Sequence, residues 1–496
     1  MLLYIQWLGT AVMAAQPLNG GFLHANGRGE LTDELGRVRI LHGVNRVRKA
    51  PPWYFVEQTT SDDEFALMQE LGLTALRLGF MWSGYNPAPG IFNKTYIDTI
   101  HSIIERASRH GIYVLLDMHQ DCFSSNFCLY DGVPQWVANK STPRHSFPWP
   151  FTGNCSSRGW GENCLTEAAA TAYQDLYDNK NGMLDDLGAF WAEAATHFAS
   201  VPAVLGYEIM NEPFAGDFYA KPDRLLPGIA GATNLQRMHD AVAARIRQHD
   251  RRHLVFYEPV TWGMIFDEEA GGVIGSGFEH VPGGAQFANR SVFSFHYYCK
   301  SFAPSGKPRM QKILCDDAIA PLIFAAVAQE TARLGGAAMM TEGLSCDYDD
   351  PGSAAECVSV LARLDAHLLS WTDYALSQGS TWSPSASTRE GWARTHARAV
   401  AGRPINMTFD ASSKDFEFCY VPDPAVRAPT EIFASVRYSY SCGRVVSATS
   451  NLAVTGAATD DVLHVAPVTA QGSEQQWEAA AGCVWIRRAA AHCTHG

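Results

Sequence analysis

Short apolar runs alternate with longer segments of helical spacing between residues 38 and 376 of the chain. The apolar runs predict eight strands, at 38–44, 74–79, 113–118, 204–210, 254–258, 292–297, 337–341 and 368–374. Helical patterns lie between them at 61–70, 96–110, 183–199, 236–247 and 318–334. Repeated βα units of this number predict an α/β fold, a (β/α)8 TIM barrel. A doubly wound open sheet is the alternative, but no GxGxxG motif follows the first strand, so its dinucleotide-binding form lacks its signature.

Two regions depart from this alternation. Residues 123–182 are rich in Pro, Gly, Trp and Asn and predict a long loop after the third strand, at the end of a barrel where active sites form. After about residue 400, β-like runs at 405–409, 415–420, 431–440, 445–448 and 462–465 are separated by Pro, Gly and Ser. We therefore expect a catalytic barrel over residues 18–398 and a C-terminal β-sandwich over residues 400–496.

The charge balance disfavours two classes of partner. The chain has 496 residues, with 38 Lys and Arg against 51 Asp and Glu, which gives a net charge of −13. Nucleic acid and anionic membranes both attract clustered cations, so we expect neither as a general partner. The apolar first sixteen residues end in small side chains and resemble a secretory signal peptide at 1–16. This run is shorter than the ~20 residues of a bilayer span, so we expect no transmembrane segment.

Cysteines and glycosylation sequons favour a secreted or lumenal glycoprotein, extracellular or lysosome-like. The chain has 12 cysteines, and its sequons begin at Asn93, Asn139, Asn154, Asn289 and Asn406. Proximity along the chain suggests the disulfide pairs Cys122–Cys128, Cys155–Cys164, Cys346–Cys357, Cys419–Cys442, Cys483–Cys493 and Cys299–Cys315.

Two glutamates lie where predicted strands end. Glu212, in Tyr207-Glu-Ile-Met-Asn-Glu-Pro213, follows the fourth strand, and Glu342 follows the seventh. Alternation of side chains along a strand predicts that Glu208, Met210 and Glu212 share one face, with Glu212 at the barrel mouth and Glu208 deeper. Two carboxyl groups facing each other across the mouth are what retaining glycoside hydrolysis requires, one as proton donor and one as nucleophile.

Four other polar side chains lie at predicted strand ends, namely Arg77, His119, His296 and Tyr298. An Arg or Tyr beside a carboxylate lowers the pKa of that carboxylate and keeps it anionic, whereas apolar surroundings keep a carboxyl group protonated. One glutamate therefore needs neighbours such as Arg or Tyr that keep it anionic, and the other needs apolar neighbours that keep it protonated.

These segments resemble glycoside hydrolase family 5, and most closely its endoglycoceramidases. The likeness is carried by Leu116-Asp-Met-His-Gln-Asp121, Met210-Asn-Glu-Pro-Phe214, Asn45-Arg-Val-Arg-Lys-Ala-Pro51 and Ala428-Pro-Thr-Glu-Ile-Phe433. It spans residues 20–465 and implies a barrel with a C-terminal β-sandwich. The chain departs from the family pattern at Tyr374 with the following Ala-Leu-Ser, and at the Cys346 and Cys357 that follow the seventh strand.

The resemblance implies catalytic roles for Glu212 and Glu342 and supporting roles for three of their neighbours. Glu212 would be the general acid/base, supported by Asn211, and Glu342 would be the nucleophile. Arg77 and Tyr298 would steady the nucleophile. The resemblance implies neither a cofactor nor a metal.

The resemblance also implies substrate-binding roles. His119 and His296 would line the subsite of the reacting sugar, and Asp121 and Lys49 would bind sugar hydroxyls. Trp371, on the last strand, would be the stacking platform beneath that sugar.

The implied substrate is a glycosphingolipid, cut between the glycan and the ceramide to release an oligosaccharide or a hexose. Such an amphiphile, met at a membrane or micelle surface by a monomeric enzyme, needs a cleft that is polar at one end and apolar at the other. Candidate apolar walls are Phe80, Trp82, Trp136, Phe147, Trp149, Trp160, Phe214 and Phe218.

Three alternatives remain open. A β-glucosidase or β-glucanase of the same family would share the two glutamates. A metal-dependent hydrolase could use Asp117, His119 and Asp121, which alternate along the chain and could point the same way. A carbohydrate-binding barrel without catalysis would keep the fold alone.

Overall fold

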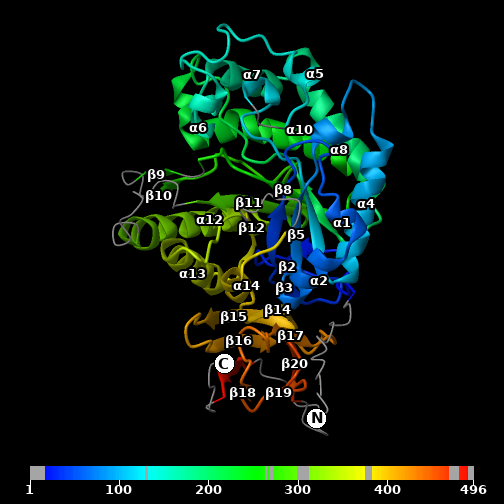
Figure 1. The fold of residues 1–496 in the computed structure, drawn as a ribbon, viewed down its shortest axis with the longest axis vertical. Helices are drawn as coiled ribbons and strands as arrows, with labels where there is room; N and C mark the ends of the chain where they lie inside the picture. The colour runs from blue at the N-terminus through cyan, green and yellow to red at the C-terminus, as the bar shows by residue number, and fades with distance from the viewer. Residues whose placement is uncertain are drawn as a thin grey trace, which may run out of the picture.

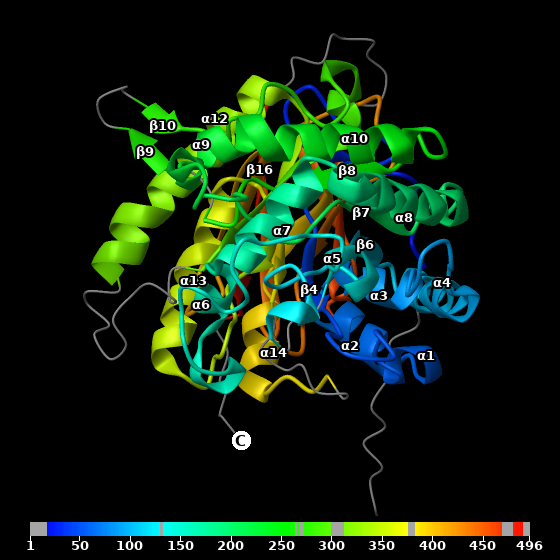
Figure 2. The ribbon, with the colours of Figure 1, turned by 90° about the horizontal axis from the view of Figure 1, so that it is seen from above.

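A closed barrel of eight parallel strands forms the centre of the molecule, as predicted (Figures 1 and 2). The computed structural model describes residues 17–128, 132–262, 265–267, 272–298, 312–374, 382–468 and 480–489. The strands are β4 (His42–Arg46), β5 (Ala75–Gly79), β6 (Tyr113–Asp117), β7 (Val204–Glu208), β8 (Leu254–Tyr257), β11 (Ser291–Tyr297), β12 (Ala337–Gly343) and β13 (Ser370–Asp373). Pairing of β13 with β4 completes the ring. Burial on both faces accounts for the mainly apolar sequences of strands such as β6, β8 and β11.

Helices surround the barrel and bury one face against it (Figure 2). The longer ones are α4 (Lys94–Arg109), α8 (Met183–Phe198), α10 (Gln236–Arg247), α12 (Ala320–Leu334) and α13 (Pro351–Ala366). The shorter ones are α1 (Glu57–Thr60), α2 (Asp63–Glu70), α3 (Trp82–Tyr85), α9 (Pro227–Ala230) and α14 (Ala386–Trp392). In α4 the Asn93 side chain accepts a hydrogen bond from the Tyr96 N–H at 3.1 Å, which caps the helix start.

The predicted long loop after β6 folds into a cap over the carboxyl ends of the barrel strands, at the top of Figure 1. Its helical segments are η1 (Ser125–Phe127), α5 (Gln135–Ala138), η2 (Cys155–Ser157), α6 (Trp160–Cys164), α7 (Glu167–Tyr177) and η3 (Lys180–Gly182). Other loops on the barrel contribute η4 (Pro222–Leu225), η5 (Gly231–Leu235), β9 (Ile265–Asp267), β10 (Gly272–Ile274), η6 (Ala285–Arg290) and η7 (Lys312–Ile319). The disulfide Cys122–Cys164 fastens the cap to the segment that follows β6, and Cys128–Cys155 joins two segments of the cap.

Pairing of cysteines by proximity is mostly wrong. Cys346–Cys357 is confirmed, whereas Cys122–Cys128 and Cys155–Cys164 are replaced by the two cap disulfides. Cys419 bonds to Cys483, so the expected Cys419–Cys442 and Cys483–Cys493 are also wrong. The fold brings together cysteines 27, 42 and 64 positions apart, because strand pairing and the folded cap outweigh distance along the chain. The expected Cys299–Cys315 involves Cys299, outside the described residues.

Below the barrel, two antiparallel sheets form a β-sandwich (Figure 1). One sheet has the order β1 (His24–Ala25), β2 (Leu31–Thr32), β3 (Val38–Arg39), β14 (His396–Val400), β17 (Thr430–Phe433), β20 (Val462–Pro467) and β19 (Leu452–Thr455). The other has the order β15 (Gly402–Phe409), β16 (Phe416–Pro422), β21 (Gly482–Arg488) and β18 (Arg444–Ala448). Buried Val400, Met407, Phe418, Ile432 and Val465 pack in their shared core.

The expected strand at 38–44 is in fact two strands. Val38 and Arg39 pair with β14 of the sandwich, and His42 begins the barrel strand β4. An apolar run does not indicate which sheet it joins. Strand pairing in the tertiary structure is what divides these residues between the sandwich and the barrel.

Candidate active site

The guanidinium group of Arg77, on β5, is fully buried at the centre of the barrel mouth. Its Nε donates to Glu208 Oε2 at 2.5 Å, and its Nη2 lies 3.1 Å from Asp117 Oδ1. Its Nη1 donates to Glu342 Oε2 at 2.7 Å, and its Nη2 donates to Asn211 Oδ1 at 2.7 Å. One cation therefore ties together side chains from β5, β6 and β12 and from β7 and the turn that follows it.

Both carboxylate oxygens of Glu342, in β12 near its carboxyl end, are hydrogen-bonded. Oε2 accepts from Arg77, and Oε1 accepts from the Tyr298 hydroxyl at 2.9 Å. Burial favours the neutral acid, but the positive charges of His296 and Arg77 outweigh burial and hold the pKa of Glu342 below its ordinary value. Glu342 is therefore kept ionised.

Glu212 lies in a turn rather than in a strand. β7 ends at Glu208, and Glu212 has φ = +43°, a left-handed conformation that costs a residue other than glycine about 1–3 kcal/mol. The alternation expected for Glu208, Met210 and Glu212 fails beyond Glu208, because neighbouring Asn211 also reaches the mouth, where it bonds Arg77. Met210 is instead buried in the main hydrophobic core.

The surroundings of the Glu212 carboxyl group differ from those of Glu342. Burial raises the pKa of Glu212, and a hydrogen-bonded contact of 2.9 Å between His296 Nδ1 and Glu212 Oε1 offsets only part of that effect. Single ligand atoms of Glu212, His296 and Glu342 lie within 4.8 Å of one another. The mouth thus holds two adjacent carboxyl groups, one biased toward its protonated form and the other toward its ionised form.

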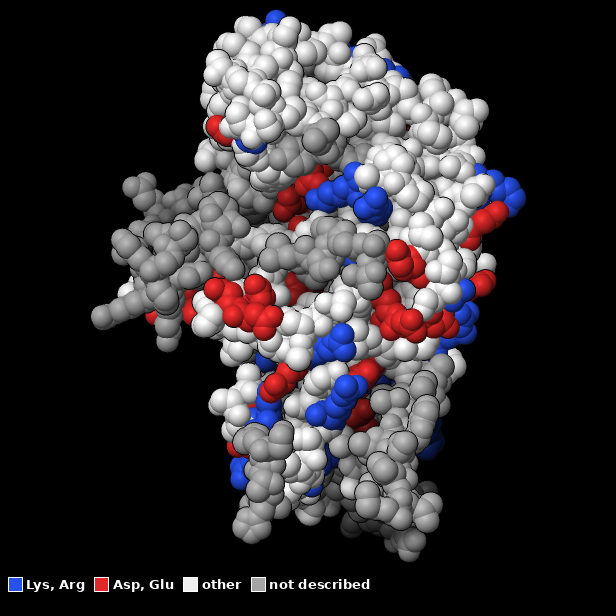
Figure 3. Space-filling model, viewed as in Figure 1, with Lys and Arg blue, Asp and Glu red and all other residues white. Residues whose placement is uncertain are grey.

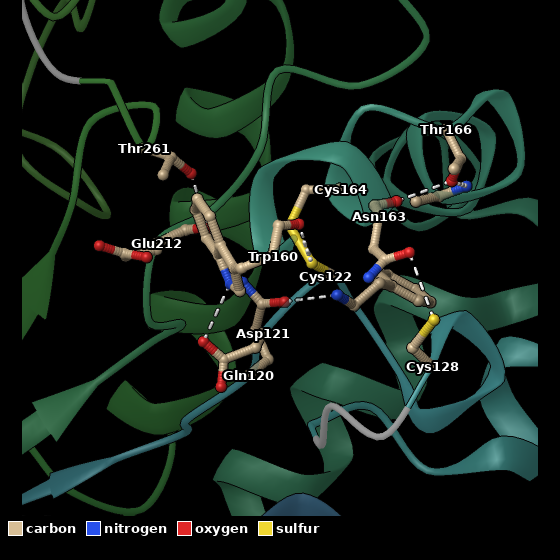
Figure 4. The surroundings of a disulfide bond; sticks show 12 residues. Gln120, Asp121, Cys122, Cys128, Trp160, Asn163, Cys164, Thr166, Glu212 and Thr261 are labelled. Atoms are coloured by element: carbon tan, nitrogen blue, oxygen red, sulfur yellow. Dashed lines mark hydrogen bonds between the residues drawn. A yellow bond between two sulfur atoms is a disulfide. The ribbon is translucent and has the colours of Figure 1, made fainter. Parts of the chain in front are cut away.

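A second set of polar side chains lies beside the two glutamates. Lys49 Nζ lies 2.5 Å from Asp121 Oδ2, and Trp160 Nε1 donates to Asp121 Oδ1 at 3.2 Å (Figure 4). His119 Nδ1 is bonded to Asp117 Oδ2 at 2.7 Å. Burial and the charge of Lys49 lower the pKa of His119 to about 3, so the ring is neutral. Its buried Nε2 has no hydrogen-bond partner among the residues that the structure describes. Acidic and basic side chains lie next to one another in the recess beneath the cap in Figure 3.

The expected role of Trp371 as a stacking platform is wrong. Its side chain is 0% exposed, and its ring packs against His42 with centroids 4.6 Å apart. His42 in turn stacks on His396 of β14 at 3.7 Å, so Trp371 lies between the barrel wall and the β-sandwich. No sugar can reach it there.

The expected apolar walls are only partly accessible. Phe80 and Trp82 are both 0% exposed and pack against Phe190, so these two candidates are core residues and not walls of the cleft. Trp149 and Trp160 are exposed, at 41% and 37%. The others are half-buried or buried, namely Trp136, Phe147, Phe218 and Phe214.

Sequence reasoning gave no role to three residues of the site. Asn45 accepts from Arg77 Nη1 at 2.9 Å, and the Tyr374 ring lies parallel to His119 with centroids 6.2 Å apart. Glu258 follows β8 and lies 3.4 Å from His296 Nε2. A signal for Glu258 exists, since Glu-Pro at the end of a strand also occurs at Glu212.

The alternative metal set of Asp117, His119 and Asp121 is held by other partners. Asp117 faces Arg77, and Asp121 faces Lys49. Among the described residues, the groupings with ligand-like spacing are Glu208, Glu258 and His296, and Glu212, His296 and Glu342. Arg77 bonds Glu208 and Glu342 within these groupings, so the protein supplies a cation of its own there.

Comparison with known proteins places the chain in a family. Residues 37–380 match cellulase (glycosyl hydrolase family 5), and residues 394–478 match the glycoside hydrolase family 5 C-terminal domain. The endoglycoceramidase of Cyanea nozakii is 32% identical over 437 residues, covering 81% of this chain and 82% of that protein. The endoglycoceramidase of Hydra vulgaris is 35% identical over 418 residues, covering 79% and 76%.

A solved structure shares the whole architecture. Endo-glycoceramidase II from Rhodococcus sp., in its ganglioside GM3 complex, matches with a TM-score of 0.71 at 21% identity, over 92% of this chain and 99% of that one. The two matched domains and the relatives of 32% and 35% identity agree, and the chain therefore belongs to glycoside hydrolase family 5, among its endoglycoceramidases.

Proposed function

We propose that this glycoside hydrolase is a retaining endo-β-glycosidase that cuts glycosphingolipids between glycan and ceramide, releasing oligosaccharide or hexose and ceramide. The observation that carries the proposal is the pair of carboxylate oxygens of Glu212 and Glu342 within 4.8 Å. This spacing suits the carboxyl separation of about 5–5.5 Å in retaining enzymes and not the roughly 6.5–9.5 Å of inverting ones. The endoglycoceramidase relatives support the substrate class.

In the first step Glu342 attacks the anomeric carbon while protonated Glu212 donates its proton to the ceramide oxygen. The carbon–oxygen bond to ceramide breaks as the glycosyl–Glu342 ester forms. In the second step ionised Glu212 takes a proton from water, whose oxygen displaces Glu342 from the same carbon. Tyr298 and Arg77 hold the Glu342 oxygens for both steps, and Asn211, bonded to Arg77, orients the turn that carries Glu212.

The remaining polar side chains bind the sugar in this proposal. Neutral His119 offers its free Nε2 to a sugar hydroxyl, and Lys49 and Asp121 offer a cation and an anion side by side. Trp160, held by Asp121 and 37% exposed, provides an aromatic face in place of the buried Trp371. His296 lines the same subsite through its contact with Glu212.

The proposed setting is a monomeric, secreted or lumenal glycoprotein that meets its amphiphilic substrate at a membrane or micelle. Four sequon asparagines are exposed, at Asn93, Asn139, Asn154 and Asn289, and Asn406 is half-buried. Across the described residues, no helix is both long and apolar enough to span a bilayer. A mobility shift of the secreted protein on treatment with a peptide N-glycosidase tests this setting.

A panel of substrates separates the proposal from its alternatives. Glucosylceramide and a ganglioside are compared with cellobiose and laminarin, and products are identified by mass spectrometry. Intact glycan together with free ceramide is the expected result, and proton NMR is expected to show the β-anomer first. Cleavage of cellobiose or laminarin alone would indicate a β-glucosidase or β-glucanase, and binding without products would indicate a carbohydrate-binding barrel.

A further inference from the structure

Glu258 is a buried carboxyl group with two separate contacts in the active site. It follows β8, is 3% exposed, and its Oε2 accepts a hydrogen bond from the backbone N–H of Glu212 at 3.1 Å. Its Oε1 lies 3.4 Å from Nε2 of His296, whose other nitrogen lies 2.9 Å from Glu212 Oε1. Within the described part of the chain, neither Glu258 Oε1 nor His296 Nε2 has a hydrogen-bond partner, so their contact is an ion pair. Glu258 thus reaches Glu212 twice, through the main chain and through His296.

We propose that Glu258 is a positioning residue for the proton donor. One oxygen holds Glu212 in its left-handed turn, and the other keeps His296 as an imidazolium that donates from Nδ1 to Glu212. The proposal deepens the proposed function and rests on it, because it gives Glu258 a task only where Glu212 and Glu342 are the reacting groups.

The first part follows from how the turn is held. Glu212 has φ = +43°, so its backbone needs external partners to stay in that conformation. Its N–H bonds Glu258, and its C=O accepts from Gln120 Nε2 at 2.9 Å and from Thr261 Oγ1 at 2.8 Å (Figure 4 shows Gln120, Glu212 and Thr261). Glu258 therefore fixes the peptide group before Glu212, and Gln120 and Thr261 fix the peptide group after it. The three side chains come from different loops.

The second part follows from the charges around the two groups. Glu258 faces His296 from β11, Arg77 from β5 at 3.8 Å, Glu208 from β7, and Glu212. Burial, Glu208 and Glu212 raise the pKa of Glu258, and the positive charges of His296 and Arg77 act against them, so its ionised form depends on the imidazolium beside it. His239 on α10 bonds only the Glu258 main-chain oxygen, at 3.0 Å.

His296 lies among acidic groups, namely Glu212, Glu258 and Glu342. Burial opposes the imidazolium, but these carboxyl groups, Glu258 first, raise the pKa of His296 to about 10. With its second nitrogen facing Glu258, His296 presents a proton to Glu212 from Nδ1.

Glu258→Gln keeps the shape and the hydrogen bond to the Glu212 N–H but removes the charge, so His296 loses its proton at a lower pH. On the alkaline side of the optimum, Glu212 then loses a neighbouring cation that lowers its pKa. The alkaline limb of the pH profile of kcat/KM, which follows Glu212, is therefore expected to move to higher pH by at least about half a unit. The acid limb, where His296 is protonated with or without Glu258, is expected to stay in place.

Thr261→Val is the matched control, since it removes a hydrogen bond on the other side of Glu212 without removing a charge. We expect it to lower kcat and to leave both limbs in place. If Glu258→Gln lowers kcat or thermal stability with the alkaline limb unmoved, Glu258 is merely structural and the proposal is overturned. Activity of the unaltered enzyme on glucosylceramide tests the proposed function separately.

A measurement on the unaltered protein covers the case in which Glu258→Gln fails to fold. In protein labelled with 15N-histidine, the His296 signals, assigned by their loss in His296→Gln, are expected to be those of a doubly protonated ring at pH 8. A singly protonated His296 ring at pH 8 would overturn the proposal.

Discussion

The active site and the junction between barrel and sandwich each place cationic side chains among carboxyl groups, but the ratio of cations to carboxyl groups is opposite. At the junction Arg37, Arg39 and Arg398 surround two carboxylates, Asp33 and Glu431, at distances of 2.6 to 3.4 Å. The active site instead places Arg77, Lys49 and His296 among six carboxyl groups, namely Asp117, Asp121, Glu208, Glu212, Glu258 and Glu342.

This difference separates a structural cluster from a reactive one. Where cations are in excess, every carboxylate stays ionised and no proton needs to be held. Where carboxyl groups are in excess and buried, some of them must keep a proton near neutral pH, which is what acid catalysis needs. The composition of a buried cluster, more than its burial, indicates whether it performs chemistry.

The largest expected effect concerns Glu342. Glu342→Ala is expected to lose almost all turnover, because the enzyme has no group to form the covalent intermediate. Azide, which fits the vacated space, is expected to restore part of the turnover and to give a glycosyl azide of inverted anomeric configuration, seen by NMR. Glu431→Gln at the junction is the control and is expected to keep kcat. Normal turnover by Glu342→Ala would refute the assigned role.

Replacing one buried arginine in each cluster compares the effects of the two clusters on stability and on turnover. Arg77→Met and Arg37→Met each leave buried carboxylates unpaired, and each is expected to cost about 3–5 kcal/mol of the free energy of unfolding, measured with urea. Only Arg77→Met is expected to lower kcat of the folded protein as well, since Glu342 loses a hydrogen bond and a charge. An equal loss of kcat in Arg37→Met, at a temperature where both fold, would break the comparison.

The two clusters are also expected to respond differently to acid. Burial works against ionisation of Glu431, but Arg398 and Arg37 outweigh it and lower its pKa to about 2. Because this value lies below that of the unfolded chain, the stabilisation is complete above pH ~5 and is lost as the pH falls toward 2, an effect of about 3 kcal/mol. Urea unfolding at pH 3 and pH 6 is expected to show a smaller difference in Glu431→Gln than in the unaltered chain.

Activity is expected to fall on both the acid and the alkaline side of an optimum, whereas the stabilisation at the junction is lost only in acid. It falls in acid as Glu342, with its lowered pKa, gains a proton, and it falls in alkali as Glu212, with its raised pKa, loses one. A profile of kcat/KM with a single limb would contradict the division of labour between the two glutamates.

The smallest expected effect is that of a chelator. The charges in the mouth are balanced by Arg77, Lys49 and His296, so EDTA is expected to leave kcat/KM unchanged. Loss of activity that zinc or another divalent ion restores would favour a metal-dependent hydrolase instead.

Much of the fold was predictable because the signals are local. Most barrel strands lie in apolar runs, and the periodicity of these runs and the turn residues around them identify them without knowledge of their partners. Strands such as β14, β19 and β21 were missed, since edge and sandwich strands carry weaker alternation. Arg77, His119, Glu342 and Tyr298 meet at the mouth because carboxyl ends of parallel barrel strands share one rim.

Alone, the sequence determined the order of strands and helices, the presence of a β-rich tail, and the position of two glutamates after the fourth and seventh barrel strands. The tertiary structure alone decided the cysteine partners, the burial of Trp371, the left-handed turn at Glu212 and the contact of Glu258 with His296. Periodicity and strand ends are properties of neighbours in the chain, whereas exposure, charge balance and proton affinity depend on residues that only barrel closure and sheet packing bring together.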